Sequence, residues 1–309
     1  MNRALLAAAA TGVQVGPAIV ASRFVVGEVP PLTLALLRYA VGFLCLAPFA
    51  WPVLKLFLAH PSAGRSLSAT ASGVLDLAVM AALGIGQFAV LIALLNFGLQ
   101  HVGAGRAALI FSLFPLLTLL LSAALGRERI TPALGTGVLL SIAGVALSLA
   151  PKLGAAHPGH WWGELAMLAS AGVGALCSVL YRPYLQRYPT LPVSALAMGA
   201  SVLLLAPMAL VEDWPTRVAA LSAQAWAVVA FIGISSGAGY FAWLYALKHE
   251  SPTRVTVFLA LNPVTAALLG ALLLGEAVDS WTLAAIACIA GGLWLATRTG
   301  SGARKVPAA

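Results

Sequence analysis

Apolar stretches of about 20 residues recur along this chain from residue 4 to residue 297, with only short polar gaps between them. A helix needs roughly 20 mainly apolar residues to cross the hydrocarbon core of a bilayer, which is about 30 Å thick. The chain has 309 residues, of which 61% are hydrophobic and 8% charged, whereas soluble domains carry about 25% charged residues. These figures exclude a soluble globular protein, and also a soluble domain on one anchoring helix.

Ten of the apolar stretches are long enough to be membrane spans, and the longest gap between them is 53–73. They are rich in Ala, Leu and Gly and show no strict alternation of polar and apolar residues. This pattern favours helices over barrel strands, which would have segments of about 10 residues. We therefore predict an all-α integral membrane protein with ten transmembrane helices. The expected helices cover 4–24, 32–52, 74–97, 104–125, 133–150, 162–181, 192–211, 225–247, 253–275 and 281–297.

The 17 Lys and Arg residues outnumber the 9 Asp and Glu residues, which gives a net charge of +8. If the N-terminus is cytoplasmic, most of these cations fall on the cytoplasmic side, as the positive-inside rule requires. The opposite side clearly keeps only Lys152 and Arg217, while Arg23 and Arg106 lie at helix ends. We therefore expect both termini, and the tail of 298–309, in the cytoplasm. The cytoplasmic set is Arg3, Lys55, Arg65, Arg127, Arg129, Arg182, Arg187, Lys248, Arg254, Arg298, Arg304 and Lys305.

An RNA-binding surface or an anionic-lipid patch is the alternative explanation for this positive charge. The basic residues, however, are spread over many short loops and do not form one run. We therefore expect no nucleic-acid partner. Arg298, Arg304 and Lys305 lie where they would contact anionic lipid headgroups.

The chain contains an internal duplication. Residues 97–125 align without a gap with residues 245–273, at an offset of 148. The match extends beyond hydrophobicity to charged residues, prolines and glycines. The matched pairs are His101 with His249, Arg106 with Arg254, Pro115 with Pro263, Glu128 with Glu276 and Gly144 with Gly292.

Upstream, the duplication continues at an offset of 159, which places 46–50 on 205–209 and Arg23 on Arg182. Each half of the chain therefore repeats five helices. Because five is odd, the second copy must enter the membrane from the opposite side, so the two repeats are inverted. Inverted repeats are typical of secondary transporters, whose substrate sites lie near the midplane between the repeats.

Two matched prolines, Pro115 and Pro263, lie near the middle of the fourth and ninth expected helices. A proline removes a backbone hydrogen bond, which can leave the carbonyls of Phe111 and Leu259 unpaired. In lipid such carbonyls need a neighbouring helix, water or a ligand as a partner. The prolines are therefore gating candidates beside a wet cavity, or they are kinks that only shape packing.

The segments AALIFSLFPLLTLLLSAALGRE at 107–128 and VTVFLALNPVTAALLGALLLGE at 255–276 resemble the duplicated EamA domain of the drug/metabolite transporter superfamily. LALLRYAVG at 34–42 is similar to helix 2 of that family, with Arg38 at the usual arginine position. The resemblance covers nearly the whole chain. It departs from the family in helix 1, where TGVQVG at 11–16 lacks the tryptophan often found there.

The resemblance implies a ten-helix carrier in a bacterial inner (plasma) membrane, with cytoplasmic termini and EamA-like repeats at 1–150 and 162–297. It also implies a small metabolite substrate such as an amino acid, often moved outward, and a central cavity built by helices 1, 3, 4, 6, 8 and 9. We expect alternating access, no enzymatic activity and no cofactor. The expected partners are the small-molecule substrate and the lipid bilayer, with the chain a monomer or a homodimer.

Charged residues are costly at the bilayer centre and are functional candidates there. Arg38 lies about seven residues into helix 2, where it would meet an anionic group or extend to the nearer surface. A structural role is favoured, because the residue aligned with it in helix 7 is Ala197.

Glu128 and Glu276 end their helices at matching places and are potential proton carriers. Their position beside turns favours a structural role that ties loops together.

Uncharged polar residues near midspan are the main candidates for a substrate-binding cavity, because they would hydrogen-bond a zwitterion without fixed charge. Gln87 and Ser235 are equivalent in the duplication, which places polar groups from both halves at similar depth. Helix-to-helix hydrogen bonding is the alternative role for each of them. Trp243 would form an aromatic wall with Phe241. The cavity candidates are Gln14, Gln87, Ser112, Ser178, Ser235, Tyr240, Trp243 and Asn262.

Two other functions are kept as alternatives. A carrier of phosphorylated or nucleotide sugars would need several cations at cavity depth, and Arg38 alone is secure. An intramembrane serine hydrolase would use Ser235 within Gly233 to Gly237, which fits the G-x-S-x-G pattern but lies inside an expected helix. No metal site is expected, because Cys45, Cys177 and Cys288 each lie alone in a different span, and His157 and His160 lack further ligands nearby.

Overall fold

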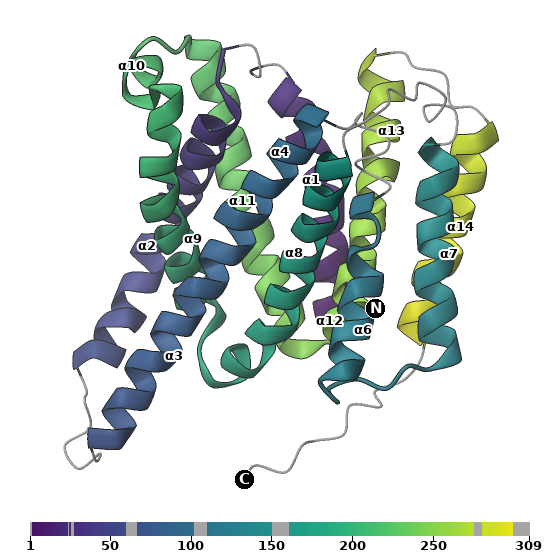
Figure 1. Ribbon diagram of the computed structural model, residues 1–309, viewed down its shortest axis with the longest axis horizontal. Helices are drawn as coiled ribbons and strands as arrows, with labels where there is room; N and C mark the ends of the chain where they lie inside the picture. Colours follow the sequence, from purple (N-terminus) through teal and green to yellow (C-terminus); the bar gives the residue numbers. More distant parts are fainter. Residues whose placement is uncertain are drawn as a thin grey trace.

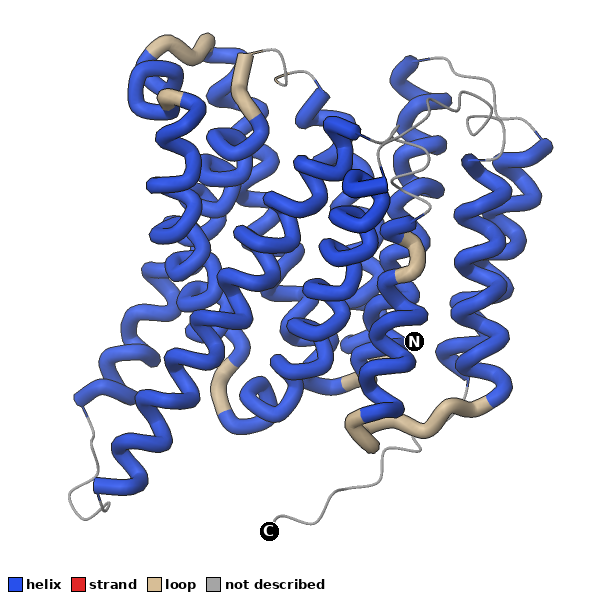
Figure 2. Tube along the Cα trace, in the orientation of Figure 1, coloured by secondary structure: helices blue, strands red, loops and turns tan. Residues whose placement is uncertain are grey.

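The computed structural model describes residues 2–23, 25, 28–59, 67–101, 110–149, 161–274 and 280–298. Every regular element within these ranges is a helix, and these ranges contain no strand (Figure 2). The prediction of an all-α fold is therefore confirmed for the described part of the chain.

The helices of the first half follow the expected order. They are α1 (Arg3–Arg23), α2 (Pro31–Ala59), α3 (Leu67–Ile85), a π-helix η1 (Gly86–Val90), α4 (Leu91–His101), α6 (Phe114–Ala124) and α7 (Pro132–Leu149). Segments α3, η1 and α4 run on without a gap and together form the third expected helix. Several helices are longer than predicted, because hydropathy marks only the apolar part of a helix that continues into polar surroundings.

The second half repeats this order. Its helices are α8 (Trp161–Arg187), α9 (Thr190–Met208), the 3-10 helix η3 (Ala209–Glu212), α10 (Trp214–Ala219), α11 (Ala223–His249), α12 (Pro252–Val257), the 3-10 helix η4 (Phe258–Ala260), α13 (Leu261–Leu274) and α14 (Ser280–Arg298). The short helix α10 was not expected. It has too few residues to give a periodic pattern in the sequence.

Local sequence signals set several helix ends. Pro31, Pro132 and Pro252 are the first residues of α2, α7 and α12, where the N–H group that proline lacks has no helical partner in any case. Ser222 caps α11, because its hydroxyl accepts a hydrogen bond from the Ala225 amide at 3.1 Å. Gly126 ends α6 with a positive φ of 65°, a conformation that glycine adopts without steric cost.

The two halves run in opposite directions through the molecule. In Figure 1, α1 runs upward from the N-terminus, whereas its counterpart α8 runs downward. We call the end where α6, α8 and α11 finish the lower face, and the end where α2 and α11 begin the upper face. The last described helix, α14, ends at the lower face, on the side where α1 starts (Figure 1).

The contacts between helices are equivalent in the two halves, so that each contact of a helix has a counterpart made by the matching helix of the other half. Helix α1 packs on α11 and α13, and correspondingly α8 packs on α3–α4 and on α6. Helix α2 packs on α11 as α9 packs on α3, while α2 with α9 and α7 with α14 form pairs between equivalent helices. Two hydrogen bonds at aligned positions show the same equivalence. Thr11 Oγ1 donates to the Gly239 carbonyl at 3.1 Å, and the aligned Ser170 Oγ donates to the Leu91 carbonyl at 2.9 Å.

The outer surface of the bundle is apolar. Leu203, Val211 and Leu272 are each about 80% exposed, at 79%, 83% and 80%, which is expected of side chains that face lipid and not water. Within the described residues, five helical segments have the length and composition to cross a membrane: Pro31–Trp51, Gly73–Gly98, Trp161–Arg187, Thr190–Glu212 and Ala223–His249. Shorter apolar helices at Arg3–Val15, Phe114–Ala124, Pro132–Leu147 and Leu283–Arg298 complete the bundle.

Candidate functional site

Three of the long helical units depart from α-helical geometry in mid-course. The π-helix η1 interrupts the third unit, and the 3-10 helix η4 precedes α13 in the ninth. In the fourth unit a turn at Ser112 and Leu113 separates a short helical segment from α6. Such interruptions leave backbone groups outside the regular hydrogen-bond ladder, and π-helical turns occur frequently at functional sites.

Two of the three interruptions coincide with the matched prolines. Pro115 is buried at the start of α6, directly after the turn, and Pro263 is the third residue of α13, shortly after η4. Gly12 of α1 allows a close approach to this second break, since a Cβ atom at Gly12 would lie 2.2 Å from the Phe258 carbonyl oxygen. The first and second halves are therefore in direct contact at the break.

Polar side chains of α1, α2 and α11 meet inside the bundle. The side-chain amide of Gln14 donates a hydrogen bond to the Ser235 hydroxyl. On the adjacent face of α11, Arg38 Nε donates to the Ser236 hydroxyl at 2.5 Å, and this hydroxyl in turn donates to the Ile232 carbonyl at 2.6 Å. Helix α11 thus carries two neighbouring serines, each bonded to a long polar side chain of the first half.

Arg38 is a half-buried cation with a neutral partner. In the described part of the chain its guanidinium bonds a hydroxyl, and no carboxylate pairs with it. The arginine therefore keeps an uncompensated positive charge inside the helical bundle. Such a charge attracts an anionic group, and the attraction is stronger in the bundle interior than in water.

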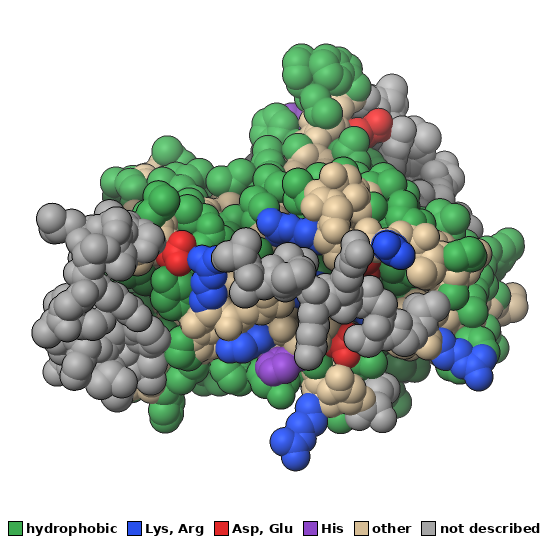
Figure 3. Space-filling model, turned by 90° about the horizontal axis from the view of Figure 1, so that it is seen from below, with side chains coloured by type: hydrophobic (Ala, Val, Ile, Leu, Met, Phe, Trp, Pro, Cys, Tyr) green, Lys and Arg blue, Asp and Glu red, His purple; other side chains and the backbone are tan. Residues whose placement is uncertain are grey.

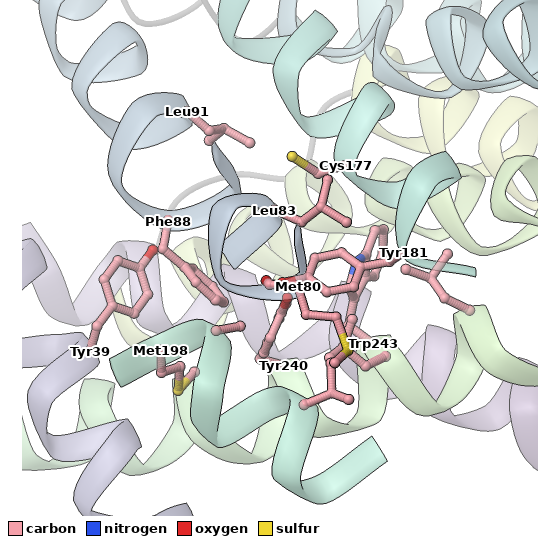
Figure 4. Close-up of a cluster of buried hydrophobic side chains, with 14 of the residues drawn as sticks. Tyr39, Met80, Leu83, Phe88, Leu91, Cys177, Tyr181, Met198, Tyr240 and Trp243 are labelled. Carbon is pink, nitrogen blue, oxygen red and sulfur yellow. The ribbon is translucent and has the colours of Figure 1, made fainter. Parts of the chain in front are cut away.

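A cluster of aromatic rings lies inside the bundle (Figure 4), and the Arg38 guanidinium carbon lies 5.6 Å from the centre of one of them, the ring of Tyr39. The Phe88 ring of η1 lies between Tyr39 of α2 and Tyr240 of α11, with ring centroids 4.5 Å and 4.3 Å away. One turn further along α11, Trp243 meets Phe114 of α6 edge to face, with centroids 6.5 Å apart. The two halves therefore share an aromatic cluster beside the Gln14 and Arg38 hydrogen bonds.

Two buried side-chain oxygens have no hydrogen-bond partner among the described residues. They are Gln87 Oε1 in η1 and Asn262 Oδ1 in α13. A buried polar atom without a partner costs about 1–3 kcal/mol, so such atoms are normally satisfied by water or a ligand. Both belong to residues that the sequence singled out as cavity candidates.

The other candidates are placed differently. Ser178 is fully buried, and its hydroxyl donates to the Gly174 carbonyl of its own helix at 2.8 Å. Ser112 lies in the turn before α6. Glu276 and the side chain of Pro263 lie outside the described residues.

Glu128 joins two elements at the lower face. The turn after Gly126 directs its carboxylate to α12, where Glu128 Oε2 accepts a hydrogen bond from Thr253 Oγ1 at 2.6 Å. At the same face, Glu250 accepts a hydrogen bond from Asn2 at 2.9 Å and pairs with Arg254 at 3.3 Å. We call these contacts the lower-face network, which comprises Asn2, Glu128, Glu250, Thr253 and Arg254. It links α1, α6 and α12 on this side.

The G-x-S-x-G pattern has no hydrolase-like setting. Ser235 lies within α11, and its partner is the Gln14 amide, not a base. His249 is the last residue of the same helix, about 21 Å away along the axis at 1.5 Å per residue. The nucleophile pattern normally needs a turn between a strand and a helix. Among the described residues there is also no group of three His, Cys, Asp or Glu side chains that could hold a metal ion.

Sequence reasoning missed several members of the site, namely Ser236, Phe88, Tyr39 and Thr253. One signal was available for two of them. Phe88 and Ser236 are equivalent at the offset of 148 and directly follow Gln87 and Ser235, the equivalent pair that was identified. Neighbouring residues of a helix point about 100° apart. Phe88 and Ser236 therefore lie at the same depth as Gln87 and Ser235 but face other helices.

Comparison with known proteins agrees with this architecture. The model of the EamA-like transporter family matches residues 2–150 and 161–298. A "probable terminal-alkyne amino-acid exporter" of Streptantibioticus cattleyicolor is 30% identical over 233 residues, which cover 74% of this chain and 76% of the relative. An "aromatic amino acid exporter YddG" of Ancylobacter novellus is 32% identical over 198 residues, or 62% of this chain and 66% of the relative.

Two further similarities span more of the chain or compare its fold. An "uncharacterized transporter" of Archaeoglobus fulgidus is 27% identical over 226 residues, which cover 72% of this chain and 78% of the relative. A crystal structure with 25% sequence identity superimposes with a TM-score of 0.75 and covers 98% of this chain and 99% of its own. The family model accounts for both halves of the sequence, and the chain therefore belongs to the EamA-like transporter family, whose members are small-molecule transporters of the membrane.

Proposed function

We propose that this chain is a secondary carrier that exports a small zwitterionic amino acid by alternating access. One observation carries the proposal. Arg38, which bonds a hydroxyl and pairs with no carboxylate among the described residues, lies beside a cluster of aromatic rings contributed by both halves. The names of two relatives, which are amino-acid exporters, support the same substrate class.

The site offers a suitable partner for the carboxylate, the ammonium group and the side chain of such a substrate. The Arg38 guanidinium would bind the carboxylate, because a bidentate pair of two ionised groups is stronger than a single bond from the guanidinium to the neutral Ser236 hydroxyl. Gln87 Oε1 and Asn262 Oδ1 are buried acceptors without partners among the described residues, which suits an ammonium group. The rings of Tyr240 and Trp243 would contact the side chain and add cation–π attraction to the ammonium.

In this proposal, the two inverted halves move relative to each other during transport. We propose ten spans, in which the interruptions at η1, at the turn before Pro115 and at η4 are the points where helices bend. The lower-face network links α1, α6 and α12, so the described conformation is held together at that face. Opening toward it would require these hydrogen bonds to break, while Glu276, the counterpart of Glu128, would form the matching contact on the upper side.

We further propose that the lower face is cytoplasmic and that the membrane is the bacterial inner membrane. Lys and Arg side chains are spread over the lower face (Figure 3). Arg127, Arg129, Arg187 and Lys248 belong to helix ends or turns at this face. This distribution follows the positive-inside rule.

The test is counterflow by purified protein in liposomes loaded with one labelled amino acid, with a panel of neutral, aromatic and charged amino acids and one sugar phosphate outside. We expect exchange with neutral or aromatic amino acids. The variant Arg38→Gln should lower exchange about 10-fold or more, since hydrogen bonds to charged groups contribute about 1.5–3 kcal/mol. The matched control is Arg129→Gln, which removes the same charge from an exposed position.

Size-exclusion profiles and melting temperatures of both variants separate loss of binding from loss of folding. Absence of exchange across the panel with folded protein would contradict the proposal. Exchange of the sugar phosphate alone would favour the phosphate-ester alternative. Equal exchange by Arg38→Gln and Arg129→Gln would remove Arg38 from the site.

A further inference from the structure

A pocket of about 230 Å³ lies between α3 and α8 near the lower face. Its lining combines two cations with apolar and aromatic side chains. The lining residues are Val79, Arg127, Leu180, Pro183, Tyr184 and Arg187. None of them belongs to the proposed substrate site or to the lower-face network.

A proline in α8 fixes the position of the first cation. Pro183 has no N–H group, so the carbonyl of Val179, four residues earlier, loses its helical donor. Arg127 Nη1 donates to this carbonyl at 2.7 Å. The bond uses one of the five N–H donors of the guanidinium, and it holds the Arg127 side chain against α8 at the wall of the pocket.

The second cation is more loosely held. The Arg187 side chain is 71% exposed, and its guanidinium lies 3.7 Å from Asp76 Oδ2. Asp76 also accepts a hydrogen bond from the Tyr188 hydroxyl at 2.9 Å. Asp76 therefore pairs with Arg187, while Arg127 bonds a neutral carbonyl, and no carboxylate is among the described residues that line the pocket.

The surroundings of the pocket are apolar and exposed. Val74 and Leu75 of α3 are 63% and 64% exposed, and Leu176 of α8 is 43% exposed. Both helices are among those long and apolar enough to span a membrane. The pocket therefore opens between lipid-facing helices at the depth where a span ends, with its charged side chains at the outer end.

We propose that this pocket binds the phosphate headgroup of an anionic phospholipid in the leaflet at the lower face. Arg127 and Arg187 contact the phosphate, Tyr184 donates a hydrogen bond to the headgroup, and the acyl chains lie along the apolar surfaces of α3 and α8. Basic pockets between helices at a membrane surface suit such headgroups, because the cations gain an anionic partner while the apolar walls stay in lipid.

The experiment measures lipid binding by the full-length, delipidated protein in detergent. Phosphatidylglycerol and phosphatidylcholine with identical acyl chains are titrated, and bound lipid is counted by native mass spectrometry. We expect phosphatidylglycerol to bind at least 10-fold more tightly. The double variant Arg127→Gln/Arg187→Gln should lose this preference, whereas the control Arg129→Gln/Arg217→Gln, with the same loss of charge outside the pocket, should keep it.

A second variant tests the geometry without removing charge. Pro183→Ala restores an N–H donor for the Val179 carbonyl, which releases Arg127, and alanine is well tolerated in helices. We expect it to weaken phosphatidylglycerol binding by several-fold while the protein stays folded. Phosphatidylglycerol binding is also measured in the presence of inorganic phosphate or glycerol phosphate. Neither compound should displace the lipid at concentrations comparable to that of the lipid.

Three results would overturn the proposal. They are equal binding of the two lipids by the wild-type protein, equal losses in the pocket and control double variants, or full competition by free phosphate. Unchanged lipid preference in Pro183→Ala would show that the position of Arg127 against α8 does not matter, and would likewise contradict it.

Discussion

Small residues decide how closely the helices of this bundle approach one another. Gly174 of α8 receives the ring of Phe114, since a Cβ atom there would lie 2.0 Å from Phe114 Cε2 and 2.8 Å from Leu91 Cδ1. Gly239 of α11 lies against the amide of Gln14, because a Cβ atom there would lie 2.3 Å from Gln14 Oε1. These glycines provide the space that the aromatic cluster and the Gln14 hydrogen bond require.

Replacement of Gly174 by alanine tests whether this glycine provides the space for the Phe114 ring. Gly174→Ala should destabilise the protein by about 1–3 kcal/mol, because the buried Phe114 ring must move away from the added methyl group. The measurement is the melting midpoint in detergent. Gly172→Ala is the matched control in the same helix, with no atom within 4 Å of the new Cβ, and it should be neutral or slightly stabilising. Equal shifts for the two variants would contradict the packing argument.

At the scale of elements, the two halves cap each other's helices on the upper face. The Glu212 carboxylate, at the end of η3, accepts hydrogen bonds from the amides of Leu32 and Thr33 at 3.0 Å and 2.7 Å. Glu28, before α2, accepts a bond from the Ser222 amide at 2.6 Å, where α11 begins. The first turns of α2 and α11 have orphan N–H groups, and each acidic residue satisfies them in the other half.

Removal of the Glu212 cap should loosen the start of α2. We expect Glu212→Ala to cost about 1.5–3 kcal/mol, because it removes charge-assisted hydrogen bonds to a helix N-terminus. Hydrogen exchange of residues 31–36 and the melting midpoint would show the effect. Asp213→Asn, at the neighbouring exposed position with φ of 52°, should leave both unchanged, since asparagine tolerates that conformation. Unaltered exchange in Glu212→Ala would disprove the capping role.

For the whole molecule, the packing of the two halves is what makes a transporter possible. Equivalent helices occupy equivalent places with opposite directions (Figure 1), so a contact formed on one side has a structural counterpart on the other. The lower-face network therefore has a matching position in the opposite half at Arg106 and Glu276 by sequence. We propose that the two inverted halves allow a second conformation, in which the matching contact forms on the opposite side.

The orientation can be checked by labelling in intact cells. In a chain whose three cysteines, Cys45, Cys177 and Cys288, are replaced by serine or alanine, a single cysteine is placed at Arg129 or Arg217. A membrane-impermeant maleimide should label Arg217→Cys in intact cells, and Arg129→Cys only after permeabilisation. Labelling of both positions in intact cells would contradict opposite exposure of the two faces.

Much of the fold could be predicted from the sequence, because burial in lipid leaves a strong pattern. Apolar length predicted where helices occur, and the repeated residues predicted which helices are equivalent, as the bonds of Thr11 and Ser170 illustrate. Pro115 marked a break that the structure contains. Each of these features depends on local composition or on spacing, both of which can be read from a linear chain.

The partners inside the bundle could not be predicted in this way. Helix α11 is apolar around most of its circumference, so its sequence does not show which face meets which neighbour. Only the tertiary structure directs Ser235 to Gln14, Ser236 to Arg38 and Glu128 to Thr253. The sequence determined the depth of each polar residue in the membrane, whereas the rotation and packing of the helices decided its contacts.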